Sequence, residues 1–147
     1  MGMMPQAFTN LMESCNKTIL ALEACITAAD VCEDLCESED SCSSGAQEFV
    51  KQANNCIEVC QNCIKICDEM IVQFKDQAHI DHVSALDNAV KSLGECIRAL
   101  TASIETCTLI KGCRSACQDA RDACEKALIV VDECIESCEK HEIRYTS

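Results

Sequence analysis

The chain has 147 residues, of which sixteen are Cys, three are Phe, one is Tyr and none is Trp. Its formal net charge of −13 excludes nucleic acids and anionic membrane surfaces as partners, because both require a basic face on the protein. No run of about 18 apolar residues occurs, so the sequence predicts no membrane-spanning helix. The N-terminal stretch MGMMPQAF has neither the basic nor the apolar region of a secretory signal, which favours a cytoplasmic location.

The sequence predicts an all-α fold. Only four Gly and one Pro interrupt the chain, and no segment alternates apolar and polar residues as a strand does. Apolar residues instead recur in steps of three and four, which is the period of a packed helix. The pattern predicts helices over residues 5–38, 45–76, 81–111 and 113–141. Because the turns between them are short, we expect one domain over residues 1–147, an antiparallel up-down-up-down four-helix bundle with a Cys-lined core.

Cysteines occupy positions that Leu or Ile fills in an ordinary bundle. The stretch 56–67 reads CIEVCQNCIKIC, and its steps of 4, 3 and 4 place four thiols on one helix face. Fifteen of the sixteen cysteines fall on such core positions, and Cys42 lies in the predicted turn. Aligning the antiparallel helices by their turns groups the fifteen at three levels: Cys32, Cys36, Cys107, Cys113 and Cys117; Cys25, Cys56, Cys60, Cys96 and Cys124; and Cys15, Cys63, Cys67, Cys134 and Cys138.

Three explanations for this thiol column differ in physical cost. As small hydrophobes, fifteen Cys would bury less apolar area than Leu and would weaken the bundle. As disulfides within a helix they would be strained, because Cβ atoms four residues apart lie about 5–6 Å from each other and a disulfide needs about 3.8 Å. Metal binding fits better, because thiolates select Cu(I), Zn or iron–sulfur clusters.

The spacing of the cysteines favours Cu(I) among these metals. Iron–sulfur spacings such as CxxCxxCxxxC are absent, and zinc sites need discrete sets of four ligands. Cu(I) accepts two or three thiolates, and one monovalent ion per thiolate leaves the column neutral. No Glu-x-x-His motif and no oriented Cys–His pair is present, so we expect a protein that is not an enzyme.

The stretches ACITAADVCEDLC, CIEVCQNCIKIC and CIESCEKH resemble the bacterial copper storage proteins, in particular the cytosolic type without a leader. The resemblance implies a four-helix bundle whose core holds many Cu(I) ions, and a homotetramer. A copper donor or acceptor protein would then be a partner. The third predicted helix departs from the pattern, because it carries only Cys96 and Cys107.

The sequence therefore predicts high-capacity Cu(I) storage, with two alternatives: a thiol redox or disulfide-cross-linked structural bundle, and storage of another thiophilic metal such as zinc. The predicted ligands are the fifteen core cysteines and, as an outlying thiol, Cys42. Weaker donors gather at the opposite end of the bundle, where ions would be taken up: Met12, Met70, His82 and His141. We also expect the metal-free bundle to fold, because the helices keep large apolar residues on their core faces: Phe8, Leu22, Phe49, Leu86, Leu93 and Leu100.

Overall fold

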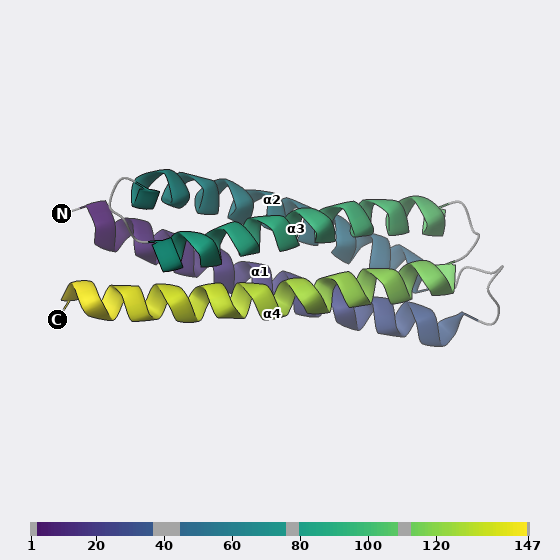
Figure 1. Ribbon diagram of the computed structural model, residues 1–147. Helices are drawn as coiled ribbons and strands as arrows, with labels where there is room; N and C mark the ends of the chain where they lie inside the picture. Colours follow the sequence, from purple (N-terminus) through teal and green to yellow (C-terminus); the bar gives the residue numbers. More distant parts are fainter. Residues whose placement is uncertain (1–2, 37–44, 76–79, 109–112, 147) are drawn as a thin grey trace.

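A computed structural model describes residues 3–36, 45–75, 80–108 and 113–146. It contains four long helices, α1 (Met3–Leu35), α2 (Ala46–Lys75), α3 (Ile80–Thr108) and α4 (Cys113–Thr146), and no strand among the described residues. Successive helices run in opposite directions, so that α1 and α3 point one way and α2 and α4 the other (Figure 1). The predicted all-α four-helix bundle is confirmed.

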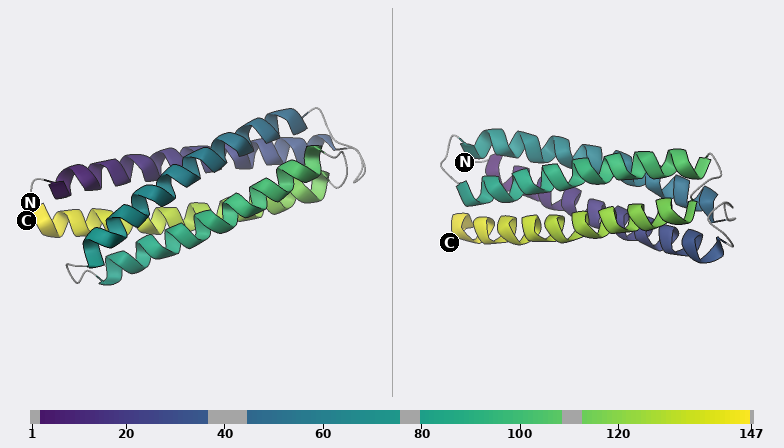
Figure 2. Two further views of the ribbon diagram at one scale, coloured as in Figure 1. Left: turned by 90° about the horizontal axis from the view of Figure 1, so that it is seen from above. Right: turned by 45° about the vertical axis from the view of Figure 1, so that its right-hand side comes forward.

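Each helix packs against two neighbours. Helix α1 lies against α2 and α4, and α3 lies against the same two helices. Both chain termini lie at one end of the bundle, and the ends of α1 and α3 lie at the other, as the two further views show (Figure 2). We call the end with the termini the lower end and the opposite one the upper end. The height of a residue is its position along the bundle axis between these two ends.

The helix boundaries differ from the predicted ones for local reasons. Helix α1 begins at Met3, two residues before Pro5, because the first turn of a helix tolerates a proline whose missing N–H has no acceptor there. It ends at Leu35, and Cys36 is already outside it. Helix α4 extends to Thr146, past the predicted end at 141, because no Gly or Pro follows to stop it. Helix α2 starts after Gly45, whose carbonyl accepts the Phe49 amide at 2.9 Å.

Thiols and small or branched apolar side chains share the core. Fifteen cysteines are buried, none more than 4 % exposed, and the largest fully buried side chains beside them include Phe49, Leu22 and Leu93. Ile57, Ile64 and Ile71 flank the cysteines of α2 and pack against this core while remaining partly exposed. These residues therefore widen the core within one chain. Among the described residues, no helix combines the length and the apolar character needed to cross a membrane.

Candidate metal centre

Contacts among fourteen of the fifteen buried cysteines divide them into three layers along the bundle, at the levels that the sequence predicted, and the Arg114 contact to the Cys36 carbonyl places Cys36 beside the upper one. We name the layers by their position between the two ends. The lower layer holds Cys15, Cys63, Cys67, Cys134 and Cys138; the middle layer holds Cys25, Cys56, Cys60, Cys96 and Cys124; and the upper layer holds Cys32, Cys36, Cys107, Cys113 and Cys117. None of these fifteen cysteines forms a disulfide in this structure.

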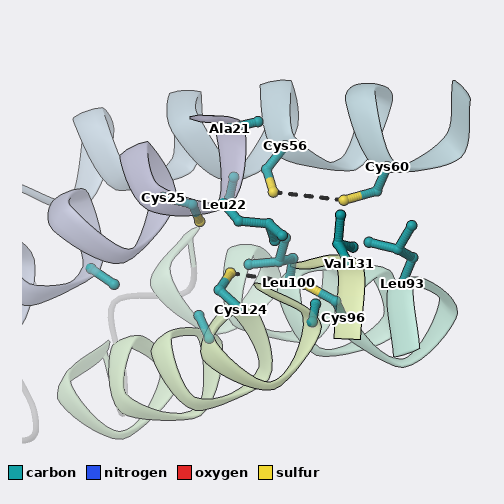
Figure 3. Packing of buried hydrophobic residues seen from close by; sticks show 14 of the residues in the cluster. Ala21, Leu22, Cys25, Cys56, Cys60, Leu93, Cys96, Leu100, Cys124 and Val131 are labelled. Carbon is teal, nitrogen blue, oxygen red and sulfur yellow. Dashed lines mark hydrogen bonds between the residues drawn. The ribbon is translucent and has the colours of Figure 1, made fainter. Parts of the chain in front are cut away.

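The middle layer draws thiols from all four helices. Figure 3 shows Cys56 and Cys60 of α2 facing Cys25 of α1, with Cys96 of α3 and Cys124 of α4 on the other side of the core. The sulfurs of Cys56 and Cys60 lie 3.8 Å apart, as do those of Cys96 and Cys124. Cys25, Cys56 and Cys124 bring their three sulfurs within 4.8 Å of one another. This distance is close enough for one ion to bind all three, because thiolate–metal bonds are about 2.3 Å long.

The upper layer contains a second group of three. Cys32 of α1 and Cys113 and Cys117 of α4 also have all their sulfurs within 4.8 Å. The Cys113 sulfur lies 3.6 Å from that of Cys32 and 3.0 Å from that of Cys107. Cys36 is buried nearby at the end of α1. The Cys113–Cys117 pair of α4 therefore meets the Cys32 thiol of α1. Neither helix alone could bring these three sulfurs together.

Polar contacts between α1 and α4 hold these upper thiols in register. Arg121 of α4 donates to Asp30 Oδ1 at 3.0 Å and to Glu33 Oε2 at 3.1 Å, both on α1. Arg114 donates to the backbone carbonyl of Cys36 at 2.7 Å and thereby satisfies an orphan carbonyl at the end of α1. The two arginines lie on the same helix as Cys113 and Cys117. They fix the height at which α1 presents Cys32 to those thiols.

The lower layer is built around Cys63. The neighbouring thiols of Cys15 and Cys67 and, to a smaller extent, the hydroxyls of Thr18 and Ser14 lower its pKa to about 3. Ser14 is 5 % exposed. The sequence analysis missed Ser14 as a neighbour of the thiols, because it precedes Cys15 and lies beside the core positions of α1. Thr18 occupies a core position and donates to the carbonyl of Ser14 at 2.8 Å.

In the lower and middle layers, hydrogen bonds among thiols lower the pKa of some cysteines and raise the pKa of others. Bonds from Cys124 and Cys56 lower the pKa of Cys25 to about 5, and Cys124 likewise lowers the pKa of Cys56 to about 5. The pKa of Cys124 is raised, because its proton is shared with Cys25 and Cys56 and because it is buried. Neighbouring thiols and burial also raise the pKa of Cys15, Cys60, Cys67, Cys117 and Cys138.

The weaker donors predicted at the lower end are only partly described. Met70 is 2 % exposed, and Met12 packs against the core while remaining partly exposed. The side chains of His82 and His141 lie outside the described residues, and so does Cys42. Their gathering at one end, and the role of Cys42 as an outlying ligand, stay predictions.

The chemistry available in this core is soft-metal binding. In the described part of the chain, the two groups of mutually close ligands each consist of three buried thiols, without a carboxylate or imidazole. Comparison of the chain with protein-family models, curated proteins and solved structures found no match. Any functional assignment therefore depends on the thiols themselves.

Proposed function

We propose that this protein stores Cu(I) ions in the thiol-lined core of its helix bundle. The observation that carries the proposal is the pair of buried three-thiol groups, Cys25–Cys56–Cys124 and Cys32–Cys113–Cys117, within a core of fifteen cysteines that form no disulfide. Two or three thiolates satisfy Cu(I), whereas Zn²⁺ takes four ligands in structural sites. The resemblance noted above supports the same cargo, and it is also the basis for proposing a homotetramer, a cytoplasmic location and a copper donor or acceptor as partner.

Charge compensation supports a capacity of many ions. A thiolate buried without a cation is costly, and a monovalent ion cancels its charge one for one. Each layer contains five buried thiols, and the middle and upper layers each contain a group ready to hold the first ion. Ions that follow can bridge the remaining thiols of a layer. We therefore expect on the order of ten or more Cu(I) ions per chain, with one ion per thiol as the upper bound.

Anaerobic titration of the reduced protein with Cu(I), in competition with a chromogenic Cu(I) chelator, tests this capacity. We expect the protein to bind about ten Cu(I) ions before the coloured complex of copper with the chelator forms. Saturation at one or two ions per chain would contradict the storage proposal. Parallel titration with Zn²⁺ tests the other metal, and we expect fewer ions and weaker retention, because four thiols must converge for each divalent ion.

A paired substitution connects the titration to the structure. Replacing Cys25 and Cys124 by Ser removes two thiols of the middle group and should weaken retention of the first ions as well as lower the total. Replacing the solvent-exposed Ser115 by Ala, also on a thiol-bearing helix, serves as the control and should leave the titration unchanged. A redox bundle would behave differently: it would bind few ions and would instead lose titratable thiols under mild oxidation, forming disulfides.

A further inference from the structure

A surface groove lies between α3 and α4, at the level of the middle thiol layer. It has a volume of about 350 Å³, and Cys96 contributes to its lining although that side chain is fully buried. Small side chains form much of the rest of the wall: Ser92 and Ala99 on α3 and Ala123 on α4. Three small side chains therefore lie next to Cys96 in the wall of the groove.

Cys96 connects the groove to the first three-thiol group. Its sulfur lies 3.8 Å from that of Cys124, which belongs to the group with Cys25 and Cys56. Cys96 also interacts with Cys60 and Cys56 across the layer. An ion bound to Cys96 is therefore one ligand exchange away from a thiol of the group.

The rim of the groove carries negative charge. Glu95, Asp119 and Asp122 line it, together with one lysine, Lys126, which gives a formal charge of −2 from three carboxylates and one ammonium. Asp122 also lies 3.9 Å from Arg121, a contact at the long limit of an ion pair. Clefts lined by charge of one sign raise the local concentration of the opposite ion. The rim favours the approach of a cation.

Two other grooves lack this connection. The larger one, of about 650 Å³ between α1 and α2, is lined by Met70 and Ser14 but by no cysteine. A groove of about 350 Å³ beside Ala24, near the upper end of α1 and α2, also has no cysteine in its lining. Of these three surface grooves, the one between α3 and α4 is the one with a cysteine in its lining.

We infer that Cu(I) is taken up through the side of the bundle, by way of the α3–α4 groove and Cys96. This inference rests on the proposed storage function and adds its route. The ion leaves its donor ligand and binds the sulfur of Cys96, which gives its proton to water or to a carboxylate of the groove. The sulfur–copper bond replaces the sulfur–hydrogen bond, and copper stays in the +1 state. Transfer to Cys124 repeats the same exchange. The two ends of the bundle, including the lower end with Met12 and Met70, are then secondary routes.

Closing the groove with larger side chains tests this route. The double substitution Ala99→Leu and Ala123→Leu fills the passage and leaves every thiol in place. Ala24→Leu fills the thiol-free groove of similar volume and is the matched control. Anaerobic stopped-flow mixing with the cationic Cu(I)–acetonitrile complex, followed by thiolate-to-copper absorbance, gives the loading rate. We expect the double variant to load about tenfold more slowly, the control to load as wild type, and all three to reach the same final copper content.

If the Ala99→Leu, Ala123→Leu protein fails to fold or binds less copper, a charge variant tests the uptake route instead. Replacing Glu95 by Gln and Asp119 and Asp122 by Asn keeps the shape of the groove and changes its rim from −2 to +1. We expect its loading to slow by about tenfold at low ionic strength and to depend less on salt than that of the wild type. If the folded double variant loads copper at the wild-type rate, the lateral route is wrong, although the storage proposal stands. Where the double variant does not fold, the same result with the charge variant leads to the same conclusion. A wild-type protein that takes up at most one or two ions would instead overturn the storage proposal.

Discussion

The core faces of α2 and α3 run side by side in the bundle but differ in chemistry. Helix α2 presents four thiols in succession, Cys56, Cys60, Cys63 and Cys67, all fully buried. The core face of α3 bears three leucines and only two cysteines: Leu86, Ala89, Leu93, Cys96, Leu100, Ser103 and Cys107. Both faces keep the same steps of three and four, so they fit one bundle equally well.

This difference separates two tasks that one core must perform. A leucine buries more apolar area than a cysteine and therefore contributes more to the stability of the metal-free fold. A cysteine contributes less burial but can bind a soft ion. Helix α3, with two cysteines, thus supplies mainly burial, whereas α2 with four and α4 with five supply ligands, and α1 with three lies between them. The two faces should respond differently to pH, to truncation and to copper.

The largest expected difference is in the response to pH, because thiols titrate and leucines do not. Six thiols of the described residues have a raised pKa, so they stay protonated in the fold while the unfolded chain loses those protons near the ordinary value of 9.0. Above pH 9 each such thiol costs about 1.4 kcal/mol of stability per pH unit. Cys25, Cys56 and Cys63, whose pKa is lowered, act in the opposite sense and add stability as pH rises toward 9. Urea denaturation of the reduced, metal-free protein should show a maximum near pH 9.

Two variants separate the thiol contribution to this curve from that of the leucines. Cys138→Ala removes one thiol of raised pKa and should make the fall above pH 9 shallower. Leu93→Ala should lower the whole curve without changing its shape, because leucine binds no proton. A flat profile between pH 9 and pH 11 would contradict the burial of protonated thiols.

Truncation of single core residues gives the next largest difference. Leu93 and Cys60 are both fully buried, on α3 and α2. In the metal-free protein, Leu93→Ala should cost about 2–5 kcal/mol, because it removes three carbons and leaves a cavity. Cys60→Ala removes one sulfur and gains helix propensity, so it should cost about 1 kcal/mol. Urea unfolding of the reduced proteins at neutral pH measures both.

Copper should reduce the difference in unfolding free energy between the Leu93→Ala and Cys60→Ala proteins. Ions that bind only the folded state stabilise it, and Cys60→Ala removes part of that gain while Leu93→Ala removes none of it. The contrast between α2 and α3 would be contradicted if, without metal, Cys60→Ala lowered the free energy of unfolding more than Leu93→Ala does. In that case, the thiol layers would contribute more to folding than their apolar area allows.

Much of this arrangement could be predicted from sequence, because it follows from period and length. The steps of three and four identify which face of each helix is buried, and short turns between helices of similar length fix the heights of the thiols. The three layers follow from these two facts. Which thiols of a layer converge does not follow, since the grouping of Cys25 and Cys56 with Cys124 depends on how each helix is rotated about its axis. The groove above Cys96 depends on small residues beside the core face, where no period applies.

The smallest expected effect concerns the helix that supplies burial. Gly94 lies within α3 beside Leu93, and a Cβ added there would meet no atom within 4 Å. Glycine inside a helix costs about 0.5–1 kcal/mol relative to alanine, so Gly94→Ala should raise the free energy of unfolding by that amount. The reverse substitution at an exposed site of the same helix, Ala102→Gly, should lower it by a similar amount. Urea denaturation resolves both changes, and neither should alter the number of Cu(I) ions bound, because neither side chain belongs to a thiol layer. If Gly94→Ala reduced copper binding, burial and ligation would not be separable tasks of this core, and the contrast between α2 and α3 would fail.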